Sequence, residues 1–573
     1  MSRGRFRSSA CVVPLLVAGC LDAGPTPLGR HLARTRDPEQ VHFVAGAVGG
    51  PNRIIFMRSE AAPASGGFVT QELSTIDDPG PGGAPVEPRV LATQVAGAFG
   101  QCATPTCVAP IDSLGRFYVV EASFMPFPGG GSSEIDDVVR IDPVTGEQRD
   151  FGPADVVGLS ADRTRAVLAP RPPPADANGQ TTFPADLVVD IDDRTTMFDL
   201  FGPEFVGDDV YFVSTAEPDF KFMRLPRGSL VPEAIADGAG NFQLYQTQRG
   251  PLLTLTRFGA LAMGHPESST LYDVTAHTEE TLPEATALAS SFAFSPSGRY
   301  VATERVPFTM VNGGIPTSDG STILTLLDRD TGQETVATAA SSLISMPIFR
   351  PNHEDEAWFT VVGDDLFRWH PGAPPEMIAH EDSPFGNPSY AWNPQEVVFT
   401  GQPVFTPDGA FRLVVEGNQS ARDPIDLQSA DDAAAPPVRL NQPNMGIEGI
   451  WPLADGRLLV ENWLTDPHEN DIYLTDPVAQ TQRQIASTGT VIATGRDRCL
   501  ALLHWIASSA TGDLTIVDYA TGAETPIAEN VPGAAVDASA DPDDALAAGT
   551  RVAFIVRNRI ASPFDGVWAF ELP

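Results

Sequence analysis

The sequence predicts an all-β protein built from repeated, antiparallel four-stranded units. Short apolar segments alternate with clusters of turn-forming residues along almost the whole chain, and two kinds of hairpin recur. No long stretch has the apolar spacing of a helix, so few helices are expected. The chain has 573 residues with 51 glycines and 53 prolines, which are dispersed as a fold with many turns requires.

The first kind of hairpin is a strand, a tight turn and a second strand. Its clearest copy is Phe292–Glu304, FAFSPSGRYVATE. Pro296 suits the first corner of a turn because its φ is preset, and Gly298 supplies the positive φ that branched residues resist. Further copies lie at Val404–Val415, Pro452–Val460, Ile111–Val120, Leu159–Leu168 and Phe349–Phe359.

The second kind of hairpin has a Thr-Gly or similar turn and follows the first. Together the two hairpins make a four-stranded antiparallel meander. The clear copies are Val138–Gln148, Leu324–Glu334 and Leu514–Glu524, and the looser ones are Leu187–Thr196, Leu271–Thr281 and Ile472–Arg483.

This pattern resembles the TolB-type, WD-like β-propeller repeats of the Pro-Asp-Gly class. The shared element is Phe-Ser-Pro-x-Gly before an apolar strand, followed by an Asp-x-x-Thr-Gly hairpin, and the resemblance covers residues 41–573. It implies four-stranded blades packed radially around a central channel. An array of β-sandwiches is the alternative, but a repeat of about 45–50 residues fits propeller blades better.

The number of repeats bears on domain organisation. About eleven units can be counted, whereas ordinary rings have about 4–8 blades. We therefore expect two propellers in tandem, formed by residues 41–285 and 286–573, with one large ring as the alternative. Pro-, Gly- and polar-rich insertions are expected to form loops on the ring faces, at 121–137, 170–185, 303–321 and 380–399.

The amino terminus reads as an export signal. Residues 1–19 carry three arginines followed by the apolar stretch Ala10–Gly19, which is too short for the roughly 20 residues of a bilayer span. The run Leu-Val-Ala-Gly before Cys20 resembles the bacterial lipobox. The resemblance implies that Cys20 carries the lipid, and the alternative is an ordinary cleaved signal.

We expect residues 20–40, which are polar and contain Pro and Gly, to form a flexible tether to the membrane. Leu21 follows the cysteine where an Asp would favour retention in the inner membrane of enteric bacteria. The sequence therefore predicts an exported protein held in the cell envelope, with the outer membrane as the expected site.

The remaining cysteines are assigned by spacing and surroundings. Cys102 and Cys107 lie five residues apart, and in an oxidising envelope we interpret them as a loop-closing disulfide. A metal site would need two more ligands, and none lies nearby in the sequence. Cys499 lies in the apolar run CLALLHWI and is expected to be a buried, inert thiol.

The composition limits the partners. A formal net charge of −38 repels nucleic acid and anionic lipid, so nucleic-acid binding is not expected. The acidic residues are interpreted as a solvated surface, with an acidic face for cations or basic partners as the alternative. Charged residues make up 19 % and hydrophobic residues 42 % of the chain, which is typical of a globular protein.

No sequence motif assigns a catalytic residue. The chain contains no Gly-x-Ser-x-Gly elbow and no His-x-x-His spacing, and His504 is expected to be a satisfied core or strand histidine rather than a ligand. Two acidic runs, Asp190-x-Asp192-Asp193 and Asp537 to Asp544, suggest calcium only weakly because neither matches the calcium-loop pattern. The second run contains Asp537, Asp541, Asp543 and Asp544.

These observations favour a lipid-anchored envelope propeller that binds a protein, peptide or glycan and is not an enzyme. The alternative is a propeller enzyme, such as a glycan lyase, glycosidase or lactonase, with its site in the central channel. A TolB-like component of an envelope complex is a third hypothesis, and it depends on fold analogy alone.

Overall fold

The structure is a computed structural model of the full chain. It describes residues 26–34, 38–43, 53–59, 71–77, 84–97, 112–126, 132–170, 186–190, 192, 194–198, 200–214, 220–258, 266–287, 289, 291–305, 308–311, 315–318, 322–339, 347–361, 365–380, 404–415, 424–463, 470–506, 510–536, 544–558 and 562–573.

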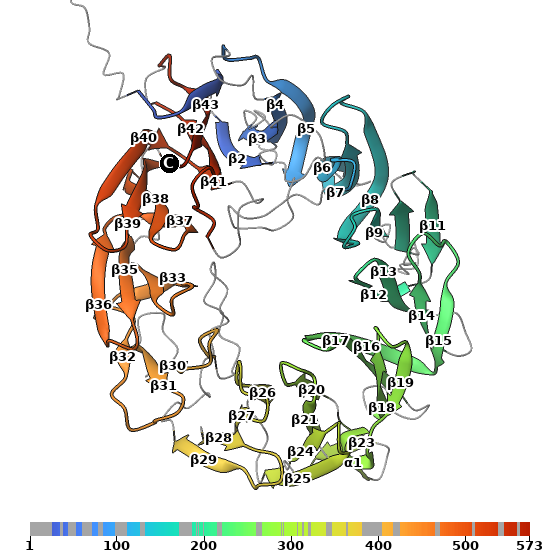
Figure 1. The fold of residues 1–573 in the computed structure, drawn as a ribbon. Helices are drawn as coiled ribbons and strands as arrows, with labels where there is room; N and C mark the ends of the chain where they lie inside the picture. Colours follow the sequence, from blue (N-terminus) through green and yellow to red (C-terminus); the bar gives the residue numbers. More distant parts are fainter. Residues whose placement is uncertain are drawn as a thin grey trace, which may run out of the picture.

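The chain forms one closed ring and travels around it once (Figure 1). The strands of the described residues fall into ten antiparallel sheets, of which seven have four strands. In the four-stranded blades, the first strand lies toward the centre and the last lies on the outside. The tandem arrangement of two propellers is therefore wrong, and the single large ring is the architecture found.

The first part of the ring is a continuous ten-stranded sheet. Strand β8 explains the continuity, because Gln148–Pro153 pairs with β7 and Ala154–Leu159 pairs with β9, so β8 ends one blade and begins the next. Sheets and predicted units consequently do not correspond one to one. The sheet contains β2 (Pro38–Phe43), β3 (Arg53–Ser59), β4 (Gln71–Asp77), β5 (Arg89–Gly97), β6 (Phe117–Pro126), β7 (Ser132–Ile141), β8 (Gln148–Leu159), β9 (Arg165–Pro170), β10 (Asp186–Asp190) and β11 (Thr195–Phe198).

Separate blades make up most of the rest of the ring. Two of them, over residues 291–339 and 446–486, contain both predicted hairpins, and the others contain one or none of them. An isolated bridge from Phe405 to Arg412 precedes the three-stranded sheet. In order, the sheets are β12 (Leu200–Val206), β13 (Asp209–Ser214), β14 (Lys221–Leu225) and β15 (Glu233–Asp237); β16 (Ala239–Thr247), β17 (Gly250–Phe258), β18 (Pro266–Asp273) and β19 (Thr278–Thr281); β20 (Ser291–Phe294), β21 (Tyr300–Arg305), β24 (Thr322–Asp328) and β25 (Gln333–Ala339); β26 (Ile348–Phe349), β27 (Ala357–Thr360), β28 (Asp365–Trp369) and β29 (Glu376–His380); β30 (Phe411–Val415), β31 (Ile425–Ser429) and β32 (Val438–Arg439); β33 (Gly446–Pro452), β34 (Leu458–Trp463), β35 (Asn470–Asp476) and β36 (Thr481–Ala486); and β37 (Thr490–Thr494), β38 (Arg498–Ile506), β39 (Thr511–Asp518) and β40 (Glu524–Val531).

The last blade joins the two ends of the chain. Strand β1 (Arg30–Ala33) is its outer strand and pairs with β43 (Gly566–Glu571), which follows β42 (Arg551–Val556) and β41 (Ala534–Val536). Residues 30–33 were expected to belong to a flexible tether, and this expectation is wrong. Leu32 and Ala33 are buried because β1 completes the blade.

The predicted cut near residue 285 falls inside a continuous core. The only helix among the described residues, α1 (Glu284–Ala287), lies here between two blades. Leu271 and Leu282 before it pack in one apolar cluster with Phe292 and Val301 after it. Residues 285 and 286 therefore mark no boundary between bodies. No helix in the described part of the chain is long and apolar enough to cross a membrane.

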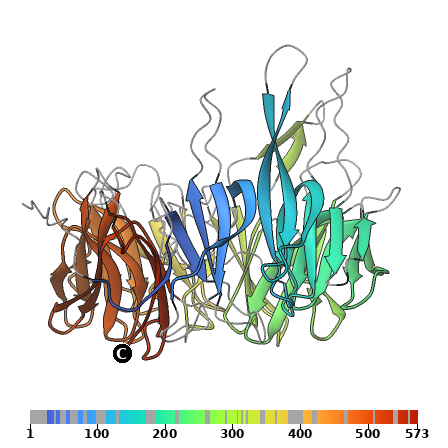
Figure 2. The same ribbon diagram turned by 90° about the horizontal axis from the view of Figure 1, so that it is seen from above.

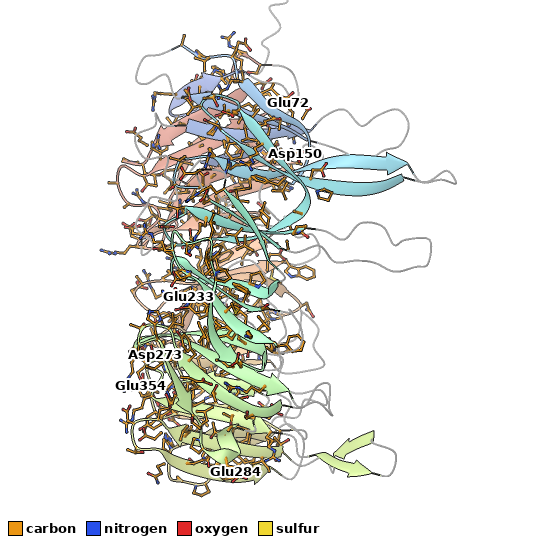
Figure 3. The ribbon with its side chains drawn as sticks, turned by 90° about the vertical axis from the view of Figure 1, so that its right-hand side faces the viewer. Glu72, Asp150, Glu233, Asp273, Glu284 and Glu354 are labelled. Carbon is orange, nitrogen blue, oxygen red and sulfur yellow. The ribbon has the colours of Figure 1, made fainter. Side chains whose placement is uncertain are left out.

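The two faces of the ring differ. The hairpin β6–β7 and the small hairpin β22 (Phe308–Val311) and β23 (Ile315–Ser318) project from one face, which we call the hairpin face (Figure 2). They occupy parts of the insertions predicted as loops. Asp273 at the end of β18 and Glu354 in a turn lie on the opposite face, which we call the tight-turn face (Figure 3).

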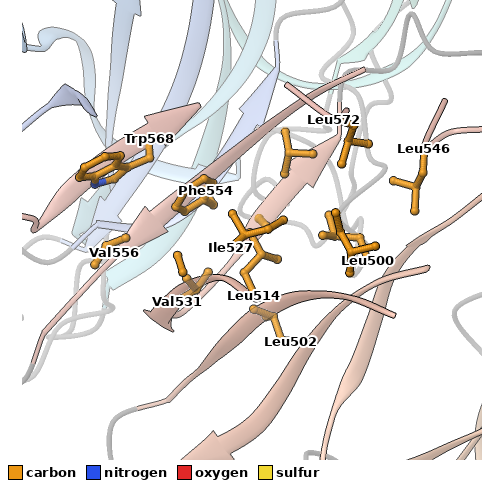
Figure 4. Packing of buried hydrophobic residues seen from close by; sticks show 14 residues of the cluster. Leu500, Leu502, Leu514, Ile527, Val531, Leu546, Phe554, Val556, Trp568 and Leu572 are labelled. Atoms are coloured by element: carbon orange, nitrogen blue, oxygen red, sulfur yellow. The ribbon is translucent and has the colours of Figure 1, made fainter. Parts of the chain in front are cut away.

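Neighbouring blades adhere through apolar side chains. Between the last two blades, Leu514 and Ile527 from one sheet pack with Phe554 and Trp568 from the next (Figure 4). Each fully buried side chain of this size contributes roughly 1.5–3 kcal/mol. In the part of the chain that the structure describes, no strand ladder joins these two sheets, so this apolar packing is a main contact between them.

Candidate functional site

The turn between the first and second strand of a blade, here called the inner turn, has a recurrent geometry. The glycine N–H donates to the carbonyl three residues earlier, as Gly298 does to Ser295 at 2.7 Å and Gly409 does to Thr406 at 2.7 Å. Both glycines have φ near +75°, which favours glycine. The inner turns of this type lie on the tight-turn face, as Glu354 in one of them shows.

Successive inner turns touch one another. A Cβ atom at Gly409 would lie 2.3 Å from the carbonyl oxygen of Pro351 in the preceding inner turn. A Cβ atom at Gly495 would lie 2.8 Å from the carboxylate of Asp544 in the following one. The inner turns therefore form a closely packed belt, and a substitution in one turn acts on its neighbour.

A pocket lies where three of these turns meet. Its volume is about 620 Å³, within the range of about 300–1,000 Å³ that is usual for ligand sites. The walls combine apolar atoms from Pro and Leu residues with carboxylate, guanidinium and hydroxyl groups. The lining residues are Thr406, Pro407, Asp408, Pro452, Leu453, Ala454, Asp455, Gly456, Arg457, Leu458, Thr494 and Gly495.

Two of the three charged groups of the pocket neutralise each other. Asp455 accepts the Arg457 N–H on Oδ1 at 3.1 Å, and its Oδ2 lies 2.6 Å from Nε of Arg457. The Arg457 guanidinium also lies over the ring of Tyr519, 5.9 Å from its centre. This carboxylate is therefore already occupied by a cation of its own turn.

Asp408 is different. Its Oδ1 accepts the Thr406 hydroxyl and the Ala410 N–H, which closes the turn. Among the described residues, Oδ2 has no hydrogen-bond or ion-pair partner. The side chain is exposed and lines the pocket, and Oδ2 lies 4.0 Å from the position of a Cβ on Gly456.

Asp162 occupies the same place in an earlier inner turn. It accepts the Ser160 hydroxyl at 2.7 Å and the Thr164 N–H at 3.0 Å, as Asp408 does with its own neighbours. Its second oxygen, however, lies 2.8 Å from Nε of Arg227 in the next blade. The turns of Asp162 and Asp408 therefore share their hydrogen bonds, but among the described residues only Asp162 has an arginine beside its second carboxylate oxygen.

Pairing of carboxylates with arginine is common elsewhere on this face. Arg299 contacts both oxygens of Asp328 at 3.0 and 2.7 Å, and these hydrogen bonds lower the pKa of Asp328 to about 2. Arg249 likewise contacts both oxygens of Asp330. Much of the negative charge of the tight-turn face is thus compensated locally.

A buried polar cluster lies in the middle one of the three blades that form the pocket. Glu461 in β34 accepts the Asn470 side-chain amide on Oε1 and the Val491 N–H of the next blade on Oε2 at 3.1 Å. Burial raises the pKa of Glu461 to about 7. Among the described residues, the Asn470 Oδ1 on the other side of this amide is buried without a hydrogen-bond partner.

Cys499 is free and completely buried, as predicted from its apolar surroundings. Burial, and next the negative charge of Glu461, raise the pKa of its thiol to about 12. A thiol held protonated in this way is a poor nucleophile, so the structure gives Cys499 a packing role.

The acidic runs singled out in the sequence do not converge on a cation site in the described part of the chain. Asp190 closes its own turn and pairs with Nε of Arg194 at 2.6 Å, and Asp192 is exposed beside it. Asp544 accepts the Arg496 N–H at 3.2 Å. The described residues contain no group of three or more His, Cys, Asp or Glu side chains that could hold a metal. Asp193, Asp537, Asp541 and Asp543 lie outside the described residues.

His504 is a strand histidine, as predicted, but not a core residue. Its ring is exposed and Nδ1 lies 3.1 Å from Oδ2 of Asp513 on the neighbouring strand. Cys20, Cys102 and Cys107 lie outside the described residues, so the lipid site and the disulfide stay predictions.

The pocket was not predicted from the sequence, although one signal for it exists. Arginine follows the glycine in three inner turns, at Arg116, Arg299 and Arg457, whereas Ala410 stands at that position beside the pocket. Aligning the repeats on their glycines would have revealed this exception. The walls themselves could not be predicted, because they come from turns about 45 residues apart.

Comparisons with known proteins give no functional assignment. No family model matches the sequence, and no curated protein matches it. Similar solved structures include the oligogalacturonate lyase of Vibrio parahaemolyticus, which is 12 % identical with a TM-score of 0.29, covering 61 % of this chain and 95 % of that one.

Two other similar structures are TolB from Acinetobacter baumannii and the β-propeller domain of the trilobed protease from Pyrococcus furiosus. Both are 12 % identical to this chain. TolB has a TM-score of 0.23, with 55 % of this chain and 77 % of TolB covered. The protease domain has a TM-score of 0.28, with 58 % and 95 % covered. At these scores we base neither fold nor function on the similarities, and the propeller class rests on the strand ladders and the ring.

Proposed function

We propose that this protein is a lipid-anchored binding propeller of the cell envelope, which holds a protein, peptide or glycan ligand on its tight-turn face. The observation that supports this most directly is the pocket formed by residues 406–408, 452–458 and 494–495. It joins three blades, so its shape depends on the closed ring and is fixed before a ligand arrives.

The chemistry of the pocket is suited to recognition. Pro407, Pro452 and Ala454 are exposed and offer apolar contact, while Asp408, Asp455 and Arg457 offer oriented polar groups. Oriented polar groups beside an apolar surface allow specific recognition, and no residue of the lining is assigned a catalytic role. We therefore retain the binding function over the enzymatic alternative.

Ring closure supports the proposed anchor. Strand β1 is the outer strand of its blade and runs antiparallel to β43, which leads to the carboxyl terminus on the tight-turn face (Figure 2). Arg30 lies ten positions after Cys20, which allows a reach of at most about 35 Å. A lipid on Cys20 would hold the outer rim of the ring close to the membrane, with the outer membrane as the proposed site.

The binding function is tested by blocking the pocket. Ala454 is exposed and lines it, so Ala454→Trp fills the pocket without touching the core. Ala479→Trp places the same side chain on an exposed outer turn as the control. Arrays of peptides and envelope glycans should contain ligands that bind the soluble Cys20→Ser protein. The same ligands should bind its Ala479→Trp variant but not its Ala454→Trp variant. Identical array profiles for the two tryptophan variants would contradict the proposal.

The enzymatic alternative is tested on the same glycans. Incubation with the purified protein should leave their size distribution unchanged and produce no new reducing or unsaturated ends. Cleavage that disappears in Ala454→Trp would establish an enzyme in place of a binding protein.

The anchor is tested by metabolic labelling with palmitate. The full-length protein should incorporate label and partition into detergent, and Cys20→Ser should do neither. Labelling that persists in Cys20→Ser would refute lipid attachment at this residue.

The proposed disulfide of Cys102 and Cys107 is tested by alkylation in denaturant. The mature protein should take up one alkyl group, on Cys499, before reduction and three after it. Uptake of three groups without reduction would show that the two cysteines are free thiols.

A further inference from the structure

We propose that Asp408 recognises an arginine side chain of a partner polypeptide, whose guanidinium takes the place that an arginine of the chain itself occupies in comparable turns. This inference rests on the proposed binding function and specifies the ligand chemistry of the same pocket. Two observations support it: the geometry of the turn at Asp408, and the alanine at position 410 where other inner turns have arginine.

The turn at Asp455 shows the complete arrangement. In Asp455-Gly456-Arg457, the guanidinium Nε lies 2.6 Å from the carboxylate two residues earlier, and the glycine has a φ of +82°. A charge-assisted hydrogen bond of this kind is stronger than a neutral one. The tripeptide Asp-Gly-Arg therefore binds its own cation.

The turn at Asp408 has the same backbone but lacks the cation. In Asp408-Gly409-Ala410, the glycine has a φ of +75° and the third residue is alanine. The carboxylate keeps the turn closed through Oδ1, which leaves Oδ2 without a partner among the described residues. The methyl group of Ala410 replaces the long side chain, so the space beside Oδ2 is open to the pocket.

The pocket can accommodate the rest of such a ligand. A volume of about 620 Å³ exceeds what one arginine side chain needs and leaves room for adjoining backbone. The Asp455–Arg457 pair is neutral as a unit, so Asp408 sets the sign of the local charge. The net charge of −38 also attracts basic segments over longer distances. These features favour a basic segment of a protein over a neutral glycan.

The probe is the peptide acetyl-Gly-Arg-Gly-amide, with the citrulline peptide as its neutral isostere. Binding to the soluble Cys20→Ser full chain is followed by NMR titration at low and at physiological salt. The arginine peptide should saturate the protein with an affinity at least about tenfold higher than that of the citrulline peptide. The difference should shrink as salt is raised, because the contact is exposed to solvent.

The decisive variant is Ala410→Arg, which recreates the Asp-Gly-Arg turn and supplies the guanidinium internally. It should abolish the preference for arginine over citrulline. Ala479→Arg adds the same charge on an exposed outer turn and should retain the preference. Asp408→Asn keeps the Oδ1 acceptor of the turn and should also lose the preference, whereas Asp162→Asn, in the matching turn of another blade, should keep it.

Equal affinity for the two peptides, or no saturable binding of either at millimolar concentration, would overturn the arginine assignment. So would an unchanged preference in Ala410→Arg. The binding function fails separately, when no array ligand distinguishes Ala454→Trp from Ala479→Trp. A neutral ligand lost in Ala454→Trp, together with equal peptide affinities, would retain the binding function and reject the arginine assignment.

Discussion

Two junctions of the ring are packed by different kinds of side chain, one apolar and one carrying a buried carboxyl group. At the closure, Leu32 and Ala33 of β1 belong to one apolar cluster with Ile555 and Val567, and His31 stacks on Trp568 at 4.5 Å. At the junction of β34 with β37, a buried carboxylate, Glu461, reaches across to the next blade.

This difference predicts which junction of the ring should respond to pH. Apolar burial itself changes little with pH, and burial lowers the pKa of His31, so the closure should weaken only when acidification protonates this ring. A buried carboxylate can be accommodated neutral much more easily than charged, so its junction should weaken as the group ionises. Both junctions are formed by β-strands of neighbouring blades, so the contrast comes from the side chains that face each junction.

The closure should show the largest effect. Leu32→Asp places a carboxylate at a completely buried position without a partner, and the free energy of unfolding should fall by about 4–5 kcal/mol. Denaturant unfolding measures it. Leu28→Asp is the control because Leu28 is 44 % exposed two residues before β1, and its effect should be slight. Equal effects of the two variants would show that β1 does not close the ring.

A third junction, around Arg350, contains a buried ion pair and can be compared with the other two. Arg350 Nε donates to the Gly409 carbonyl at 2.6 Å, and its guanidinium contacts Glu356 and Asp431. The hydrogen bond from Arg350 also holds the pKa of Asp431 below its usual range.

Arg350→Ala should lower the free energy of unfolding by about 3–4 kcal/mol, because Glu356 would stay buried without its cation. Thermal and denaturant unfolding measure the loss. Arg194→Ala removes a half-exposed partner of Asp190 and should cost about 0–1 kcal/mol. A loss below 1 kcal/mol for Arg350→Ala would mean that this junction depends on apolar contacts alone.

Glu461 should make stability depend on pH. Its pKa is raised from 4.5 to about 7 in the folded state, so between these values the folded state binds the proton and the unfolded state does not. Stability should therefore fall as pH rises through this window, by about 3 kcal/mol in total. Unfolding free energies measured from pH 5 to pH 8 would show it.

Glu461→Gln should remove that pH dependence. At pH 5 the variant and the parent should be similarly stable, and at pH 8 the variant should be the more stable one, because glutamine stays neutral. Glu524→Gln, at an exposed residue, should leave the pH profile unchanged. A variant profile that still falls between pH 5 and pH 8 like that of the parent would refute a role for Glu461.

The smallest effect is expected at the turn of Asp190, where asparagine keeps the Oδ1 acceptor of the turn. Asp190→Asn should cost about 1 kcal/mol or less, since the surface pair with Arg194 is mostly exposed on the arginine side. Calcium should leave the melting temperature of both proteins unchanged, because Arg194 already occupies the second carboxylate oxygen. A calcium-dependent rise that is lost in Asp190→Asn would show that the acidic run binds this ion.

Much of the local structure could be predicted from the sequence. The hairpin at Phe292–Glu304 is formed by β20 and β21, and the Thr-Gly hairpin at Leu324–Glu334 by β24 and β25. The buried state of Cys499 also followed from its apolar neighbours. These features depend on residues close together in the chain, whose turn preferences and alternation are visible in any short window.

The sequence by itself determined the all-β character, the paired hairpins and their radial repeat. Only the tertiary structure decided that there is one ring, that Arg30–Ala33 closes it, and that three inner turns enclose a pocket beside Asp408. The physical reason is distance along the chain. Local preferences fix a turn, but closure pairs residues more than 500 positions apart. The Oδ2 of Asp408, unpaired among the described residues, becomes a candidate binding group only because the neighbouring turns complete a pocket beside it.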